Sequence, residues 1–185
     1  MSQRAHVSDL ELAGLVSSKI CHDVIGSVSA IYNGLEILGE DDDADTKSHA
    51  LDIIRSVTQQ ASARLQFARI AFGTGGTTEA TVDLETVEKI VRGLIGRGRH
   101  ILHWHIAPGR LDRDRVRLLL NLIASAVTAL PRGGALDVGM SGAEERIAFL
   151  VRCRGPGARP PQYLAEFASG EMPPLDAMTI QAYYT

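Results

Sequence analysis

The chain has 185 residues, 45% of them hydrophobic and 22% charged, so it is long enough to bury a core and is ordinary in composition for a globular protein. Its formal net charge of −3 and its pI near 6.1 exclude a global attraction to nucleic acid or to an anionic membrane. No run approaches the roughly 20 apolar residues of a membrane span, and the polar start MSQRAHVSDLELAG has no apolar core of a signal peptide. Cys21 and Cys153 lie far apart and are interpreted as reduced thiols, so we expect a cytoplasmic protein without nucleic-acid or membrane partners.

The first part of the chain carries two long helical patterns. A helix is predicted from Ser8 or Asp9, both good cap residues, to about Leu38. The acidic run GEDDDAD at 39–45 then interrupts it, and apolar residues recurring every three or four positions predict a second helix over 46–72. The sequence therefore predicts an antiparallel helical hairpin.

Two hairpin helices of nearly thirty residues cannot enclose an apolar stripe between them and still cover both faces. The simplest remedy is to pair two hairpins into a four-helix bundle, which predicts a homodimer.

The glycine-rich stretch GTGGTTEA at 73–80 is a flexible linker by composition and the best domain boundary in the chain. It divides a helical hairpin unit, residues 1–75, from a small α/β unit, residues 80–185. In the second unit the patterns predict a helix capped by Asp83, then a strand at 100–106 and a turn at APGR. A strongly apolar helix at 112–130 follows and is stopped by Pro131. Two further strands are predicted at 135–140 and 146–153, with a turn between them. The last strand has the composition of a buried strand. The fold class is thus α+β.

His22 follows Cys21 and precedes Asp23 in the first predicted helix. An α-helix turns by about 100° per residue, so the apolar residues of this helix lie opposite His22; they are Ala13, Ile20, Val24, Val28, Ile31, Leu35 and Leu38. The neighbours of His22 are mostly small or polar, with Leu15 and Ile25 as the apolar exceptions; the others are Glu11, Ser18, Lys19, Gly26, Ser29, Asn33 and Glu36.

Four interpretations of His22 remain open: a buried packing histidine, a metal ligand, an exposed residue without a role, and a reactive group. The polar surroundings disfavour burial, and the absence of a histidine or carboxylate four residues on disfavours a metal. Near neutral pH imidazole is partly neutral, so a ring nitrogen can attack phosphorus. Lys19, one turn earlier, could offset phosphate charge, and Asp23 could orient the ring, although as the next residue it need not face it.

The segment CHDVIGSVSAIYNGLEIL resembles the helix signature of the ChpT-like bacterial histidine phosphotransferases, notably in Cys21-His22-Asp23, Ala30-Ile31 and Asn33-Gly34-Leu35-Glu36. The segment LDAMTIQAYYT at 175–185 is similar to the C-terminal helix of that family. The resemblance implies a homodimeric hairpin followed by a domain like the ATP-binding domain of sensor histidine kinases.

The departures from these patterns are also informative. The family usually has Ser-Pro where this chain has Gly26-Ser27, so a weaker kink is expected after His22. The kinase helix pattern N-x-x-x-N-A keeps Asn121 but has Ser125 at the Mg²⁺-binding asparagine, and the D-x-G-x-G loop has Cys153 at the adenine-reading aspartate. A thiol cannot accept the adenine amino hydrogen bond as a carboxylate does, so neither ATP binding nor autophosphorylation is expected. The chain also ends earlier than the family usually does, so one or two final strands are expected to be absent.

Other candidate sites are weaker. His103 and His105 share a strand face in HILHWH, but the sequence offers no third metal ligand of suitable spacing. Four arginines between 110 and 117 alternate with Asp112 and Asp114, as at a solvated helix start. Nucleophile elbows and Walker-type loops are missing from the sequence.

The resemblance implies a histidine phosphotransferase whose His22, with Asp23, carries a phosphoryl group between receiver-domain aspartates. The expected docking residues are Leu15, Ser18, Lys19, Ile25, Gly26, Ser29 and Asn33. No cofactor or resident metal is expected, because the receiver supplies Mg²⁺. The implied partners are receivers of a CckA-type hybrid sensor kinase and of CtrA- and CpdR-type regulators. The alternatives are a histidine kinase with a divergent ATP site and a non-catalytic receiver-docking module.

Overall fold

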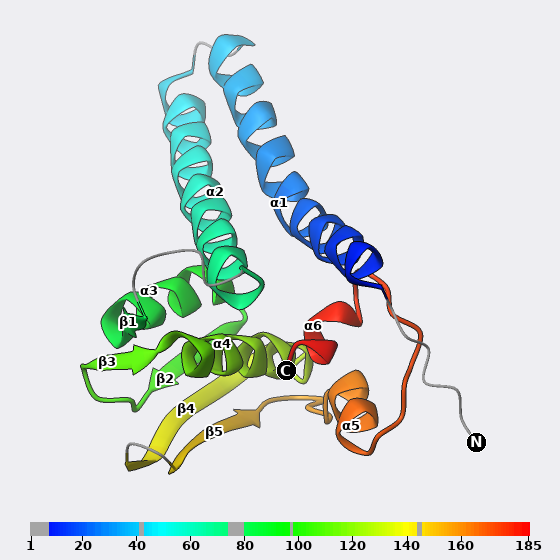
Figure 1. The fold of residues 1–185 in the computed structure, drawn as a ribbon. Coiled ribbons are helices and arrows are strands. Elements are labelled where there is room, and N and C mark those ends of the chain that lie inside the picture. Colours follow the sequence, from blue (N-terminus) through cyan, green and yellow to red (C-terminus); the bar gives the residue numbers. More distant parts are fainter. Residues whose placement is uncertain (1–7, 41–42, 74–79, 97, 144–145) are drawn as a thin grey trace.

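The structure, a computed structural model, describes residues 8–40, 43–73, 80–96, 98–143 and 146–185. Its N-terminal part is an antiparallel pair of long helices, α1 (Asp9–Glu40) and α2 (Ala44–Ala71) (Figure 1). The Asp43 carboxylate caps α2 by accepting the backbone N–H of Thr46 at 2.8 Å. Both predicted hairpin helices are confirmed, and their ends lie within two residues of those expected.

The C-terminal part combines helices with two small sheets. Its elements are β1 (Thr81–Asp83), α3 (Leu84–Ile95), β2 (His100–Trp104), β3 (Arg110–Asp112), α4 (Arg113–Thr128), β4 (Gly134–Ala143), β5 (Arg146–Arg154), α5 (Gln162–Ala168) and α6 (Ile180–Tyr183). β1 pairs antiparallel with β3, while β4 is the central strand of the other sheet, parallel to β2 and antiparallel to β5. The expected α+β class is confirmed, as is Asp83 as the cap of α3.

Several local expectations were wrong. The predicted turn at APGR runs into the short strand β3, and β4 continues to Ala143, beyond the turn expected from Ser141. β5 was expected to be fully buried, yet exposed and half-buried residues alternate along it because one face of its sheet is open to solvent. The C-terminal helix is a single turn, Ile180–Tyr183, and α5 was not predicted.

The core of the C-terminal part also includes the end of α2. Phe67, Ile70 and Ala71 of α2 are buried in the same cluster as residues of α3, α4, β2 and β4. The C-terminal end of α2 is therefore part of the hydrophobic core of the α/β unit. Most of the predicted linker, residues 74–79, lies outside the described residues.

The two hairpin helices approach closely near their loop. A Cβ at Gly34 would lie 2.7 Å from Cγ1 of Ile54, and Gly34 and Ser27 are the buried residues of α1. From there the helices diverge toward the N-terminus of α1, where α6 lies against it (Figure 1). The packing is thus tighter near the loop of the hairpin than in the N-terminal half of α1, where His22 lies.

α2 covers only part of the apolar stripe of α1. Large apolar side chains remain exposed, namely Ile25 at 65%, Val28 at 55%, Tyr32 at 61% and Leu35 at 55%. We call these four residues the α1 seam. Val28 and Leu35, which belong to the apolar residues expected opposite His22, are therefore not covered within one chain.

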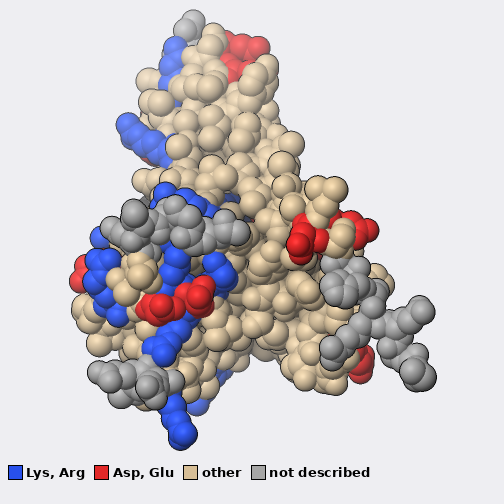
Figure 2. All heavy atoms as spheres, in the orientation of Figure 1, with Lys and Arg blue, Asp and Glu red and all other residues tan. Residues whose placement is uncertain are grey.

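Charged side chains are unevenly distributed over the surface. The visible face of the hairpin carries few charges, whereas Lys and Arg gather over the region of β1, β3 and α3 with Asp and Glu among them (Figure 2). Asp112 caps α4 by accepting the backbone N–H of Asp114 at 2.9 Å, which fits the solvated helix start expected there. Among the described residues, no helix is both long and apolar enough to cross a membrane.

Candidate functional site

His22 lies on the outer face of α1, and 66% of its side chain is exposed. It points away from α2, because Ser27, the residue that packs against α2, lies about 140° around the helix. The interpretation as a buried packing histidine is therefore wrong.

Asp23 faces His22, although adjacent residues on a helix need not do so. His22 Nδ1 lies 3.2 Å from Asp23 Oδ1, and both Asp23 oxygens lie 2.6 Å from Lys19 Nζ. A carboxylate accepts hydrogen bonds and cannot donate one, so this contact places the imidazole proton on Nδ1. The Nε2 lone pair is then left for a nucleophilic attack.

Lys19 is less available than the sequence suggested. Its side chain is only 16% exposed, and its ammonium is paired with Asp23. The ammonium of Lys19 therefore holds the Asp23 carboxylate beside His22, and it would have to leave this pair to contact an incoming phosphate.

The remaining predicted docking residues are mostly exposed. Ser18, Gly26 and Asn33 are exposed, and a Cβ at Gly26 would have nothing within 4 Å. Ser29 is exposed but its hydroxyl donates to the carbonyl of Ile25 at 3.1 Å. These residues leave room for a bulky partner beside His22.

Leu15 differs from its expectation, because it is half-buried and not exposed. It lies in the N-terminal half of α1, the part that α6 approaches (Figure 1). Ile25 is thus the more accessible of the two apolar residues predicted beside His22.

Arg64 of α2 also belongs to this site, although the sequence analysis did not include it. Its Nη1 donates to the backbone carbonyl of Asp23 and, at 3.4 Å, to the hydroxyl of Ser27. It lies 41 residues from Asp23 in the chain, and no sequence pattern relates the two.

Asn121, which the kinase-like pattern retains, is fully buried and its polar atoms are in use. Its Nδ2 donates to the carbonyl of Ala71 at 3.3 Å and to that of Arg117 at 2.8 Å, while its Oδ1 accepts from Gln181 of α6. The asparagine therefore joins α2, α4 and the C-terminal segment.

Ser125 is engaged in the same region. It is 3% exposed, and its hydroxyl lies 3.2 Å from that of Thr185. The C-terminal segment thus covers both positions of the kinase-like helix pattern.

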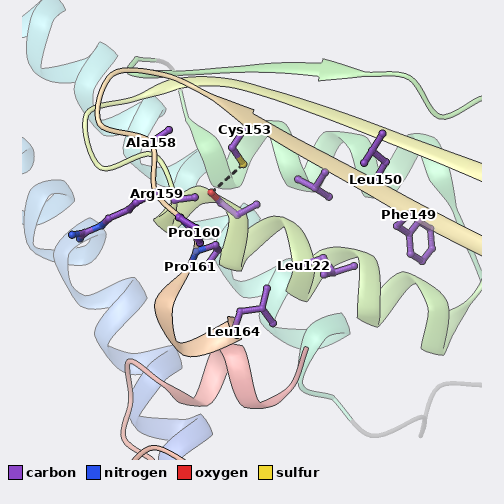
Figure 3. Close-up of a pocket in the computed structure, with 12 residues that line it drawn as sticks. Leu122, Phe149, Leu150, Cys153, Ala158, Arg159, Pro160, Pro161 and Leu164 are labelled. Atoms are coloured by element: carbon purple, nitrogen blue, oxygen red, sulfur yellow. Dashed lines mark hydrogen bonds between the residues drawn. The ribbon is translucent and has the colours of Figure 1, made fainter. Parts of the chain in front are cut away.

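Cys153 lines an apolar groove of about 570 Å³ between α4, β5 and the segment around Pro160 and Pro161 (Figure 3). Its thiol donates to the carbonyl of Ala126 at 3.5 Å. Burial raises the pKa of this thiol, and the negative charge of Asp137 raises it further. The groove therefore presents a neutral thiol at the position expected for the adenine-reading aspartate.

His103 and His105 both approach Asp137 on the open face of the sheet. His103 Nδ1 donates to Asp137 Oδ1 at 3.1 Å, and His105 Nε2 lies 3.6 Å from the same oxygen. The hydrogen bond from His103, with the nearby charge of Arg154, lowers the pKa of Asp137. Within the described part of the chain, no group of three or more His, Cys, Asp or Glu residues is arranged to hold a metal ion.

Comparisons with known proteins identify the family of this chain. The family model for the histidine phosphotransferase C-terminal domain matches residues 84–185. The whole chain is 39% identical to the protein phosphotransferase ChpT of Brucella abortus (strain 2308) and covers 88% of that protein. A solved structure of a bacterial phosphotransferase matches 99% of this chain and 87% of its own, with a TM-score of 0.84 and 36% identity. The resemblance found in the sequence is confirmed: the chain belongs to the ChpT-like histidine phosphotransferases, the phosphotransferases of bacterial phosphorelays.

Proposed function

We propose that His22 is the phosphoryl carrier of this phosphotransferase. The observation that carries the proposal is the exposed imidazole whose Nδ1 is held by Asp23, with Nε2 left as the nucleophile. Nε2 attacks the phosphorus of a receiver aspartyl phosphate, the P–O bond to the aspartate breaks, and the aspartate leaves with the electron pair. The phosphoimidazole is then positively charged, and the Asp23 carboxylate stabilises it through the Nδ1–H bond. Attack by a second receiver aspartate reverses these steps.

We propose receiver domains as the partners, namely those of a CckA-type hybrid sensor kinase as donor and of CtrA- and CpdR-type regulators as acceptors. The receiver brings its own acidic pocket and Mg²⁺, so this chain contributes the nucleophile and a docking surface. Ser18, Ile25 and Gly26 are exposed close to His22 and offer small and apolar contacts, and Asn33 is exposed further along the same face of α1.

We propose that the chain acts as a homodimer. The α1 seam leaves four large apolar side chains at 55–65% exposure, and a second hairpin would cover them. His22 lies on the polar flank of this seam, so a four-helix bundle would keep both copies of His22 on its outer surface.

We propose that the chain neither binds ATP nor phosphorylates itself. The side-chain amide of Asn121 is hydrogen-bonded to Ala71, Arg117 and Gln181, and the hydroxyl of Ser125 is hydrogen-bonded to that of Thr185. Cys153 holds a neutral thiol where the kinase pattern has a carboxylate.

The test is label transfer from a radiolabelled phospho-receiver. Wild type is expected to gain acid-labile label, and His22→Ala is expected to gain none. His49→Ala is the matched control, because His49 is an exposed histidine of α2. Asp23→Asn, which keeps the size of the side chain but loses its charge, is expected to transfer about ten- to a hundredfold more slowly.

Two further arms separate the alternatives. Label gained from ATP alone would identify a histidine kinase and overturn the proposal that ATP is not used. Unchanged label on His22→Ala would exclude His22 as the carrier. Receiver binding by wild type without any label would identify a docking module.

A further inference from the structure

We propose that Arg64 is a positioning residue for phosphotransfer, which fixes the turn of α1 that presents His22. The inference rests on the proposed function of His22. The side chain of Arg64 donates to the carbonyl of Asp23 and to the hydroxyl of Ser27, and not to the imidazole. It acts through the backbone and side chain of the adjacent turn.

The first step concerns the position of Arg64 in the hairpin. The helices are packed tightly where Gly34 meets Ile54, and they diverge toward the N-terminus of α1 (Figure 1). Between Asp9 and Gly26, α1 has no fully buried residue. Apolar packing against α2 is therefore looser around His22 than near the hairpin loop, and the long side chain of Arg64 reaches from α2 to the backbone of Asp23.

The second step concerns the groups that Arg64 holds. The carbonyl of Asp23 already accepts the N–H of Ser27 as part of the α-helix, and its second lone pair accepts Nη1 of Arg64. The same Nη1 reaches the Ser27 hydroxyl at 3.4 Å. Arg64 thus binds the turn of α1 that follows His22 at two points.

The third step connects this turn with the reacting ring. Asp23 is bound through its backbone carbonyl to Arg64 and through its carboxylate to Lys19 and His22. A contact of 3.2 Å to His22 leaves little room for displacement before the hydrogen bond is lost. Releasing the backbone of Asp23 therefore weakens the contact that keeps the proton on Nδ1 and directs Nε2 outward.

The test compares Arg64→Met and Arg64→Lys with wild type. Methionine keeps an apolar stem but has no donor, and lysine restores one donor. For Arg64→Met, the rate of phosphoryl transfer at saturating phospho-receiver is expected to fall about tenfold, with KM for the receiver unchanged within twofold. For Arg64→Lys, the rate is expected to lie between those of wild type and Arg64→Met. Arg55→Ala is the matched control, because Arg55 is an arginine of the same helix whose side chain is 73% exposed.

A second readout does not depend on transfer. The ¹⁵N chemical shifts of the His22 ring are expected to report mainly the Nδ1–H tautomer in wild type and a mixture of tautomers in Arg64→Met. A merely structural role would change thermal stability without changing the tautomer. The inference would be overturned if both Arg64 variants had the kcat and the His22 tautomer of wild type. If Arg64→Met does not fold, the same two measurements on Arg64→Lys decide.

Failure of this inference is distinguishable from failure of the proposed function. If wild type and both Arg64 variants transfer equally, His22 remains the carrier and Arg64 has no positioning role. If wild type gains no label from any receiver, the proposed function fails while the tautomer comparison still tests the contact.

Discussion

The contact between Gln181 and Asn121 allows a quantitative prediction of stability. Gln181 of α6 donates to Oδ1 of Asn121, and both side chains are buried, at 8% and 0% exposure. Replacing Gln181 by leucine keeps a side chain of similar size but removes the donor. Asn121 cannot turn its amide to compensate, because its Nδ2 already donates to the carbonyls of Ala71 and Arg117.

The cost follows from the buried oxygen that loses its partner. An unsatisfied buried acceptor costs about 1–3 kcal/mol, so we expect Gln181→Leu to lower the free energy of unfolding by about 2 kcal/mol. For a domain of this length, that corresponds to a decrease in Tm of about 4–8 °C. Leucine at this nearly closed site also buries apolar surface on folding, which offsets part of the cost of the unpaired oxygen.

The assay is thermal and urea unfolding followed by circular dichroism at one fixed protein concentration, because association would make Tm depend on concentration. Gln66→Leu is the control, since Gln66 is an exposed residue of α2 and its replacement should change stability by less than about 0.5 kcal/mol. A Gln181→Leu variant as stable as the control would refute the role of this contact as a link between α6 and α4.

Three further predictions concern other parts of the chain. Backbone N–H groups of the turn before α6 donate to Asp176 and hold its pKa below the ordinary value. The stability that the carboxylate contributes is therefore present above about pH 4 and is lost as the pH falls through the lowered pKa. In urea unfolding, the difference in free energy of unfolding between wild type and Asp176→Asn should be smaller at pH 3 than at pH 7. Exposed Cys21 should react with iodoacetamide about tenfold faster than Cys153, whose thiol is half-buried and has a raised pKa, as peptide mass spectrometry can measure. Gly14→Ala, with open space around the new methyl group, should raise the free energy of unfolding by about 0.5–1 kcal/mol, whereas Gly34→Ala should not, because its methyl group would meet a stiff isoleucine of α2.

The elements that could be predicted from the sequence are those with long periodic patterns and local caps. α1 and α2 span many turns, so their apolar spacing identified them to within two residues at each end, and Asp83 was recognised as a cap from its own type and its neighbours. β1 and β3 have three residues each, too few to show an alternation, and they are held by pairing across the chain. Their existence depends on tertiary contacts that no local pattern contains.

The candidate site shows the same division. His22 was identified because its surroundings on one helix, including Ser18, Gly26 and Ser29, are set by sequence spacing alone. Its contact with Asp23 depends on side-chain rotamers, and the contact from Arg64 depends on how two helices pack. Sequence reasoning therefore found the histidine that we propose as the nucleophile and missed the arginine that we infer to position it.

The kinase-like positions show why a retained residue is weak evidence for a retained activity. From the sequence, Ser125 and Cys153 predicted the loss of ATP binding, while Asn121 was a remnant of the pattern. In the structure Asn121 is hydrogen-bonded to Gln181 and to two backbone carbonyls, so this retained residue stabilises the contact between α2, α4 and the C-terminal segment. Restoring only the two altered residues should therefore not restore the activity.

We thus expect the variant Ser125→Asn/Cys153→Asp to bind no ATP in calorimetric titration with Mg²⁺ present. It should also be less stable than wild type, because an asparagine at 125 must fit a site that is 3% exposed and occupied by the hydroxyl of Thr185. A stable double variant that binds ATP would show that Asn121 can be released from its present contacts at little cost. Such a result would overturn our proposal that the buried contacts of the C-terminal segment prevent nucleotide binding.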